Sequence, residues 1–552
     1  MMLHSFSPAP IFTQFYNDPL PVIGVALLEK WNRDYVLRLL ISLKLATQHS
    51  STTEAHELIT KLLNFLPNDK PSKYGPVDRS ILTNKTVILK IICDLLAIPA
   101  NKNIDTDLGN AFYQDVLVTI LIYNEHQFQN TGIGKVKQNL AHADIWKIGF
   151  MQNLNAENEG TYRRIGGIKQ LLYLQFLKSE FGDAYEEFEK GVVEYTGFPS
   201  MQDIILLFVN LVVEYDRVVK RSVPLVVIGP TDNSYSLLHK LELVVDASSG
   251  SIRAEVPQLV TAPFLKLMDN KIYLLGTSDF DLITTKSWDF YLVKNKLFQK
   301  VLPKVGDIHA LKGEWGKKYY ESFLGLKILK SLEKNGIRVL ESDDKNLPDA
   351  TIIVNEKDVY VIEMKSNAMD HKVTSAQDIS GFRRFIDDKF ATGSKGVPQL
   401  NRNIEFLSKN ADTAYGLKKP TKKLRVFPVI IYTEPHLTKQ AVNDYINTVA
   451  PTISAELANC FHSVEKVTLI PMDFFLDNIG LLQKDRHVLR NLIRKYHLFV
   501  SRTKDSYAKT NRHFDYFAAM VSFESWSVGK DGMYREDQMV VFDTLRKIFE
   551  LK

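Results

Sequence analysis

Cysteine is nearly absent from this chain. Among its 552 residues only Cys93 and Cys460 occur, far apart and without a second cysteine nearby. This scarcity excludes a disulfide-stapled fold and a thiolate zinc site of the C-x-x-C type. Because such a chain suits a reducing compartment, we expect a cytoplasmic protein.

Long apolar runs are also missing. The longest, residues 204–213, is interrupted by Asn210 and is too short to cross a bilayer. The first twenty residues lack the basic start and unbroken apolar stretch of a secretory signal. We therefore expect no membrane association.

Several motifs of well-known enzyme classes do not occur. The chain has no G-x-x-x-x-G-K-[ST] phosphate loop, no H-E-x-x-H zinc motif and no G-x-S-x-G nucleophile motif. The net charge of +5 is small for this length, so overall charge does not mark a nucleic-acid binder. Any sign of a function must therefore come from local clusters of residues.

What is present is ordinary globular composition, with 45% hydrophobic and 24% charged residues, in a chain long enough for two to four domains. The pattern predicts a multidomain α and α/β protein. We expect a helical accessory domain at 1–222, an α/β core at 309–480 and a helical C-terminal segment at 481–552. Between the first two, residues 223–308 should form a β-rich module, either a small antiparallel sheet or an extended linker sheet.

The expected α/β core has a definite order of elements. A helical pattern over 312–336 precedes three short strands, then helical patterns, a strand at 424–433 and another near 466–471. This order predicts an antiparallel meander that continues into a parallel neighbour.

One stretch of this core, LPDATIIVNEKDVYVIEMKS at 347–366, carries charges in unusual places. A hairpin turning at NEKD would bring Asp349 beside Glu363, and strand alternation would put Glu363 and Lys365 on one face. Burying such charges is costly unless they pair or bind a cation, so the pattern predicts a Mg²⁺ or Mn²⁺ site. An ordinary hairpin with charged ends is the alternative.

Pro348, Asp349, Glu363 and Lys365 stand in the order of the PD-(D/E)xK motif, and the chain resembles that nuclease superfamily. Its surroundings look most like the nuclease-related and Holliday-resolvase-like branches. The resemblance implies a restriction-endonuclease-like core, Asp349, Glu363 and the Met364 carbonyl as metal ligands, and Lys365 assisting attack by water.

Two helices of this superfamily carry further site residues. Glu321 lies on an apolar helical stripe with Leu324 and Ile328, and the resemblance makes it an additional ligand or an orienting base. Glu314, seven residues earlier, is its rival. Gln399 matches a glutamine of the superfamily, but Asn403 stands where some relatives have tyrosine.

Two segments are rich in basic residues. Residues 389–425 and 484–512 each contain nine Lys or Arg against two acids. In the second segment Arg486, Arg490 and Arg494 recur every four residues, which predicts one basic helix face able to bind nucleic-acid phosphates. A solvated helix face is the alternative.

Together these patterns predict a Mg²⁺-dependent endonuclease that hydrolyses phosphodiester bonds. DNA is the first expectation for its substrate, although DNA and RNA remain open. The resemblance implies a role in anti-phage defence or restriction, with the N-terminal region sensing or presenting substrate. The alternative is a catalytically silent nucleic-acid-binding or scaffold protein. The sequence leaves open a homodimer or a partner subunit.

Overall fold

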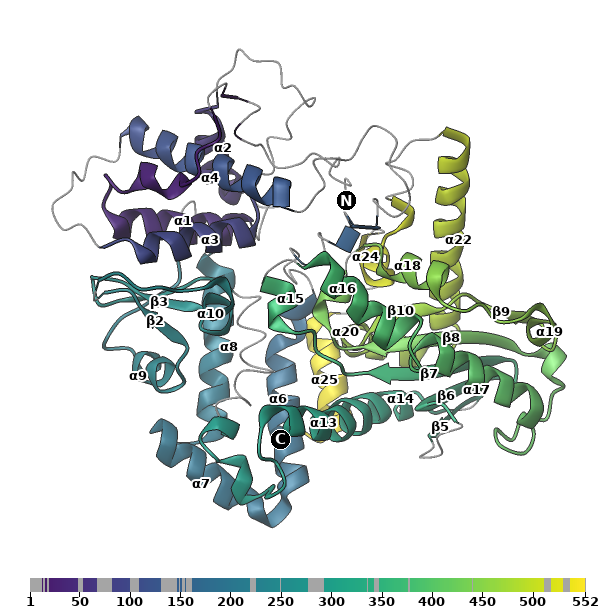
Figure 1. Cartoon of the computed structure of the whole chain (residues 1–552). Helices are drawn as coiled ribbons and strands as arrows, with labels where there is room; N and C mark the ends of the chain where they lie inside the picture. The colour runs from purple at the N-terminus through teal and green to yellow at the C-terminus, as the bar shows by residue number, and fades with distance from the viewer. Residues whose placement is uncertain are drawn as a thin grey trace. The chain divides into compact units, whose positions relative to one another are not determined.

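The fold is described from a computed structural model of the whole chain (Figure 1). The structure describes residues 12, 15–16, 19–47, 53–66, 82–99, 109–130, 146–147, 149–150, 154, 161–218, 225–248, 250–276, 292–334, 336–341, 347–375, 378–438, 440–510, 518–529 and 537–551. The chain is a mixed α/β protein with two separate sheets.

The chain forms two compact units, and each combines separated pieces of sequence. One unit comprises Asn139–Glu180 and Gly306–Lys552, and the other comprises His4–Gln138 and Phe181–Val305. This division differs from the four consecutive segments expected from the sequence. Segment 139–180 joins the α/β core, and the β-rich module belongs with most of the N-terminal helices.

The second unit is mainly helical. Its longer helices are α1 (Arg33–Thr47), α2 (Thr53–Leu63), α3 (Lys85–Ala97), α4 (Asn110–Asn130), α7 (Tyr185–Thr196) and α8 (Met201–Val218). Arg33 explains why the β-rich module does not stand apart. Its buried guanidinium donates hydrogen bonds to the carbonyls of Ile98, Ala247 and Gly250, and so ties α1 to the loop after β2 (Val244–Asp246).

The small sheet of this unit is mixed, which corrects the expected antiparallel module. Its order is β1 (Val227–Ile228), β4 (Ile272–Leu274), β3 (Phe264–Lys266) and β2. Strands β2 and β3 are parallel because helix α10 (Val256–Thr261) crosses between them. Helix α9 (Asn233–Lys240) covers the first residues of the run LHKLELVVD at 238–246, which by its composition favours a strand throughout. The run DFDLITT at 279–285, whose residues also favour a strand, lies outside the described residues.

The other unit contains the larger sheet, in the order β10 (Thr468–Pro471), β8 (Arg425–Tyr432), β7 (Asp358–Lys365), β6 (Ala350–Val354) and β5 (Ile337–Glu341), with β9 (Ser463–Val464) paired to β8. Strands β5, β6 and β7 form an antiparallel meander, and β8 runs parallel to both β7 and β10. The predicted order of strands in the core is therefore confirmed.

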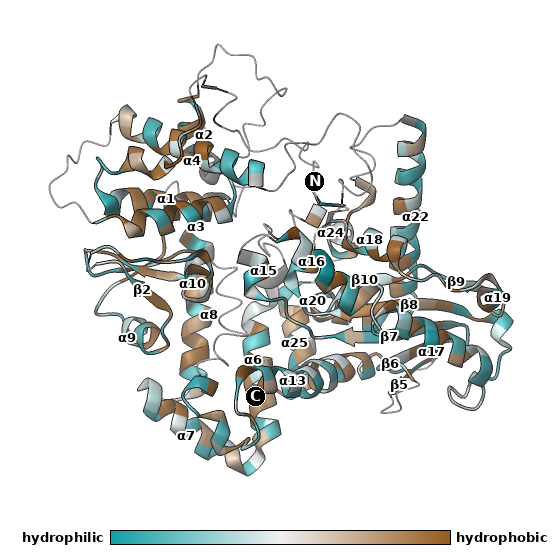
Figure 2. Ribbon diagram, viewed as in Figure 1, coloured by the Kyte–Doolittle hydropathy of each residue, from teal (hydrophilic) through white to brown (hydrophobic). Residues whose placement is uncertain are grey.

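The same unit also contains the helices that accompany this sheet. They are α6 (Thr161–Phe181), α13 (Ile308–Trp315), α14 (Lys327–Lys330), α15 (His371–Ser375), α16 (Ile379–Ile386), α17 (Val397–Asn410), α18 (Val442–Val449), α19 (Ala455–Ala458), α20 (Met472–Asp477), α21 (Ile479–Lys484), α22 (Val488–Thr510), α24 (Phe523–Gly529) and α25 (Gln538–Phe549). In Figure 2, β8 is mostly apolar, whereas the C-terminal half of α22 is mostly polar.

The core lies between the sheet and these helices. On one face Val359, Val361 and Ile430 are buried with residues of α16 and α17, such as Phe382 and Leu400. The described residues after 487 are mainly helical, as expected from the sequence, and their helices belong to the same compact unit as this core.

The helix expected at 312–336 is longer at its start and irregular in its middle. It begins at Ile308 because the Asp307 side chain accepts a hydrogen bond from the amide of Ala310. Gly316–Leu326 forms a π-helical segment, which continues into α14. Gly325 allows this segment to approach β7, because a Cβ there would lie 2.4 Å from Met364 Sδ.

Among the described residues, no helix is both long enough and apolar enough to cross a membrane.

Candidate active site

The hairpin β6–β7 places the predicted acidic residues together. Ala350 pairs with Ile362, so Asp349 lies beside Glu363 at the end where β7 continues past β6. Asn355 and Glu356 both have positive φ, as in the tight turns that connect hairpin strands. The NEKD turn predicted from the sequence is therefore confirmed.

Strand alternation in β7 divides its side chains as predicted. Glu363 and Lys365 share a face with Val359 and Val361, whose side chains are buried with those of α17. Met364 lies on the opposite face, against Gly325. The end of β7 thus projects a carboxylate and an ammonium from an apolar strand.

Asp349 is held by the backbone of β7. Its Oδ2 accepts a hydrogen bond of 2.6 Å from the amide of Met364. The amide and carbonyl of one strand residue point to the same strand edge, so the Met364 carbonyl faces the edge on which Asp349 lies. This edge offers a carboxylate oxygen and a backbone oxygen close together.

Glu363 is fully buried and both of its oxygens have partners. Oε2 accepts a hydrogen bond from Lys365 Nζ at 3.1 Å, and Oε1 accepts one from Asn403 Nδ2 at 2.8 Å. Asn403 is itself 2% exposed. The sequence had drawn attention to Asn403 only as the residue standing in place of a tyrosine.

Gln399 lies one helical turn before Asn403 on α17 and reaches the same cluster. Its Oε1 accepts a hydrogen bond of 3.4 Å from Lys365 Nζ. Because residues four apart share a helix face, α17 presents both amide side chains to the end of β7. The four-residue spacing between Gln399 and Asn403 could therefore have indicated from the sequence that Asn403 belongs to the cluster.

Burial and charge raise the pKa of Glu363. Desolvation is the larger cause and the nearby Asp349 carboxylate is the next, so the pKa of Glu363 rises to about 8 despite the opposing effect of Lys365. A carboxyl group with this pKa is protonated at neutral pH unless a cation replaces the proton.

Glu321, in the π-helical segment, takes part in the same electrostatic cluster. Burial, followed by the charge of Asp349, raises its pKa to about 7, while Lys365, Lys317 and Lys395 oppose the shift. Its rival Glu314 is about half exposed and forms an ion pair of 3.4 Å with Lys318. The structure therefore couples Glu321, and not Glu314, to the charges at the end of β7.

The donor set suits a hard divalent cation. Asp349, Glu363 and the Met364 carbonyl supply oxygen atoms, and a cation would stabilise the charged form of carboxyl groups whose pKa is raised first by burial and then by the Asp349 charge. No group of three His, Cys, Asp or Glu side chains in the described part of the chain is arranged to hold a metal by itself. Mg²⁺ commonly needs only one or two carboxylates, with water and phosphate oxygens completing its shell.

The three predicted phosphate-binding arginines do not form one helix face, which corrects that expectation. Helix α22 begins at Val488, so Arg486 lies in the preceding turn. Arg490 pairs with Asp358 at 3.2 Å and Arg494 with Glu465 at 3.6 Å. The four-residue spacing could not reveal these acidic partners, because they come from the start of β7 and from the loop after β9.

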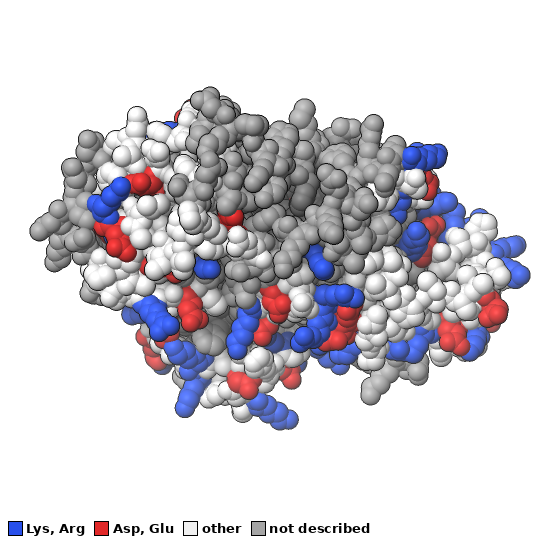
Figure 3. Space-filling view, turned by 45° about the horizontal axis from the view of Figure 1, so that its top comes forward, with Lys and Arg blue, Asp and Glu red and all other residues white. Residues whose placement is uncertain are grey.

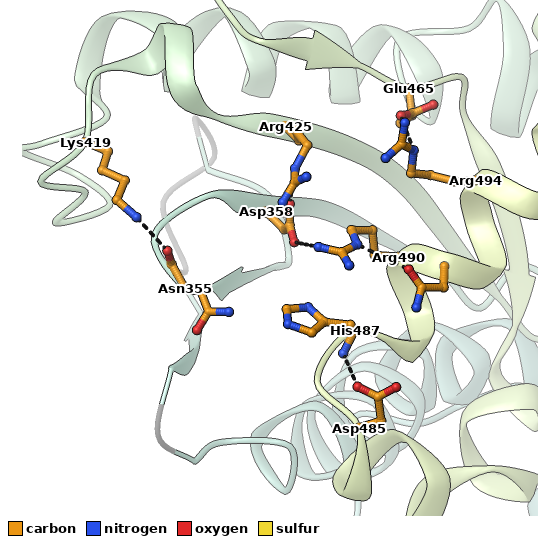
Figure 4. Close-up of polar contacts among 10 residues, drawn as sticks. Asn355, Asp358, Lys419, Arg425, Glu465, Asp485, His487, Arg490 and Arg494 are labelled. Carbon is orange, nitrogen blue, oxygen red and sulfur yellow. Dashed lines mark hydrogen bonds and ion pairs between the residues drawn. The ribbon is translucent and has the colours of Figure 1, made fainter.

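Charge on the surface is mixed. Figure 3 shows basic and acidic side chains interspersed over the described part of one face, as the small net charge of the sequence suggests. Arg490 and Arg494 lie near Asp358, at the opposite end of β7 from Glu363 (Figure 4). They therefore do not contact the carboxylate cluster.

No protein-family model, curated protein or solved structure matches this chain in comparisons with known proteins. Functional inference consequently depends on the geometry of the site.

Proposed function

We propose that this chain is a Mg²⁺- or Mn²⁺-dependent nuclease of the PD-(D/E)xK type, with a restriction-endonuclease-like core, that hydrolyses phosphodiester bonds, first of all in DNA. One observation carries the proposal. Asp349, Glu363 and Lys365 meet at the end of β7, where Gln399 and Asn403 bind two of them directly.

The chemistry follows from the residues present. Asp349, Glu363 and the Met364 carbonyl would hold the cation, which would supply charge stabilisation to the phosphate and acidify water. In hydrolysis a water oxygen bonds to phosphorus, the bond from phosphorus to one ester oxygen breaks, and the leaving alkoxide gains a proton. Lys365 would assist the attack of water and offset the negative charge that builds on the phosphate oxygens.

The remaining residues keep this arrangement in place. Asn403 and Lys365 hold Glu363 by its two oxygens, and Gln399 limits the freedom of the Lys365 ammonium. The charge of Asp349 contributes to the raised pKa of Glu321, so the two carboxyl groups interact electrostatically. Glu321 would therefore act as an additional ligand or as an orienting base. Such pre-oriented groups reduce the cost of reaching the transition state.

A cleavage assay tests the proposal. Supercoiled plasmid, single-stranded DNA and RNA are incubated with the full chain and Mg²⁺, Mn²⁺ or EDTA. We expect metal-dependent cleavage that falls at least about 100-fold in Asp349→Ala and in Lys365→Ala. Glu314→Ala is the matched acidic control and should cleave normally, whereas Glu321→Ala should lose activity.

Two results would reject this function. Metal-independent activity that survives in both Asp349→Ala and Lys365→Ala would show that another site is responsible. Binding of nucleic acid without cleavage under all metal conditions would favour the catalytically silent alternative.

A further inference from the structure

The two basic segments of the sequence meet at one end of the larger sheet. Asp358, at the start of β7 and 1% exposed, accepts a hydrogen bond of 2.5 Å from Arg425 Nε and one of 3.2 Å from Arg490 Nη1 (Figure 4). Arg425 belongs to the first basic segment and Arg490 to the second. One buried carboxylate therefore joins both segments.

The loop before β8 lies against the hairpin turn at the same end. Lys419 Nζ donates a hydrogen bond of 3.0 Å to the carbonyl of Asn355, and the Lys418 amide donates one of 3.3 Å to Glu356. Arg486 also lies near this turn, because a Cβ added to Gly336 would be 3.1 Å from Arg486 Nη1 and 2.6 Å from Asn355 Oδ1. These contacts fix the backbone under several exposed basic side chains.

The exposed side chains at this end are mainly basic, and we call them the strand-start patch. Its members are Lys357, Lys418, Lys422, Lys423 and Arg486, all exposed. None of them forms an ion pair with another residue in the described ranges.

The acidic residues nearby are already engaged. Glu356 pairs with Arg338 at 2.9 Å, Asp358 with the two arginines described above, and Glu465 with Arg494. Asp485 is the exception, since within the described residues its exposed carboxylate accepts only a hydrogen bond from the amide of His487 and keeps its charge beside Arg486. Glu356, Asp358 and Glu465 are therefore paired with arginines outside the patch, and Asp485 offsets at most one of its five basic charges.

We propose that the strand-start patch binds the phosphate backbone of double-stranded nucleic acid at a place separate from the cleavage site. Asp358 and Glu363 are five residues apart on β7, which corresponds to about 17 Å. A duplex touching both places must therefore extend at least about five base pairs from the cleaved phosphate. This inference builds on the proposed nuclease function and adds a second contact to it.

The patch favours a duplex over a single strand. Proteins that bind single strands offer aromatic side chains on which bases stack. Here the nearby rings are turned inward, since Tyr360, Tyr415 and Tyr496 are each at most 2% exposed. His497 is occupied by a hydrogen bond of 2.8 Å with Thr468 Oγ1. A surface with basic side chains but no exposed aromatic rings can bind the phosphate backbone of a duplex, but it offers no rings on which unpaired bases could stack.

A remote backbone contact should affect binding and leave the chemical step unchanged. It would stabilise the bound substrate and the transition state equally, so its loss should raise KM and leave kcat alone. Because each phosphate contact releases counterions, its loss should also weaken the salt dependence of binding.

The experiment measures binding of the full chain to a labelled 30-base-pair duplex and to the corresponding single strand, by fluorescence anisotropy in EDTA at several salt concentrations. The test variant combines Lys422→Ala, Lys423→Ala and Arg486→Ala. The control combines Lys509→Ala, Arg546→Ala and Lys547→Ala, which removes the same charges from exposed positions on α22 and α25. Thermal melts check that both variants fold.

We expect the test variant to bind the duplex at least about tenfold more weakly at low salt, and its plot of log Kd against log salt to flatten by about two to three units of slope. The control should bind like the wild-type protein. Equal binding by the test variant and the control would overturn the proposal, as would a larger loss for the single strand than for the duplex.

Failure of this proposal and failure of the nuclease proposal give different results. If the wild-type protein cleaves with metal but the test variant binds normally, only the patch is wrong. If no protein cleaves but the test variant loses duplex binding, the patch stands and the nuclease function falls.

Discussion

At the scale of single residues, the most informative group is the carboxyl of Glu363. It is fully buried, yet it has two hydrogen-bond donors, Lys365 and Asn403. Burying a carboxylate usually costs several kcal/mol unless its oxygens are satisfied. A position that only stabilised the fold would be served equally well by an apolar residue, so the polar arrangement points to a chemical role.

Asn403→Leu tests the contribution of one of these donors. The substitution keeps a similar volume but leaves Glu363 Oε1 without its partner. Since residues that orient metal ligands typically contribute 10- to 100-fold, we expect about that increase in the metal concentration for half-maximal cleavage. Metal titrations of cleavage rate measure it. Asn401→Leu, which alters the same helix but loses a bond to the Pro451 carbonyl, should leave the titration unchanged.

The raised pKa of Glu363 predicts how the stability of the metal-free protein changes with pH. Its pKa is about 8 in the folded state and near 4.5 as an ordinary glutamate, so the folded protein holds this proton more tightly. The corresponding stability is present below about pH 4.5 and is lost as pH rises toward 8. Thermal unfolding in EDTA between pH 5 and pH 9 should show this decline.

Glu363→Gln removes the titrating group and should flatten most of that decline. Glu321, whose pKa is about 7, should leave a smaller residual slope. Adding Mn²⁺ to the wild-type protein should restore stability at high pH, because the cation replaces the proton. An identical pH profile for Glu363→Gln and wild type would contradict this explanation.

At the scale of elements, the site depends on where α17 begins. Gly396 precedes this helix with φ of 66° and ψ of −124°, a conformation open almost only to glycine. A Cβ at this position would lie 2.4 Å from the carbonyl oxygen of Phe390. Gly396 therefore sets the entry of the helix that carries Gln399 and Asn403.

We expect Gly396→Ala to lower the free energy of unfolding by on the order of 1–3 kcal/mol, because the backbone or Phe390 must move. Denaturant unfolding curves measure the change. Gly313→Ala is the matched control, since Gly313 lies within α13 and its Cβ would meet open space. That substitution should be neutral or stabilise by up to about 1 kcal/mol.

At the scale of the whole molecule, the candidate nuclease unit is discontinuous in sequence. Helix α6 belongs to it, and its Phe176 ring lies 5.0 Å from that of Trp315 and 4.9 Å from that of Tyr319. Trp315 Nε1 donates a hydrogen bond of 2.9 Å to the Tyr173 hydroxyl. Residues more than a hundred positions upstream thus complete the core behind the site.

A fragment of residues 309–552, which matches the boundary suggested by the sequence, should therefore fold poorly. It would expose the aromatic surface that α6 covers. Circular dichroism melts and size-exclusion chromatography should show loss of cooperative unfolding or aggregation. In the full chain Phe176→Ala should cost about 3–5 kcal/mol. A fragment that melts cooperatively at the temperature of the full chain would disprove the dependence.

The sequence by itself determined the local features of this protein. Alternation in VYVIEMK put Glu363 and Lys365 on one face, and the turn at NEKD placed Asp349 beside Glu363. Such features depend on residues close in the chain, whose side-chain period and turn preference are fixed by backbone geometry.

Only the tertiary structure decided which distant residues meet. In the folded chain Glu363 accepts a hydrogen bond from Asn403, and Arg490 pairs with Asp358. Glu321, rather than Glu314, interacts with the charges of the site. Segment 139–180 belongs to the same compact unit as the core. These contacts result from competition among all segments to bury apolar surface and satisfy charges. No periodicity within one segment encodes that outcome.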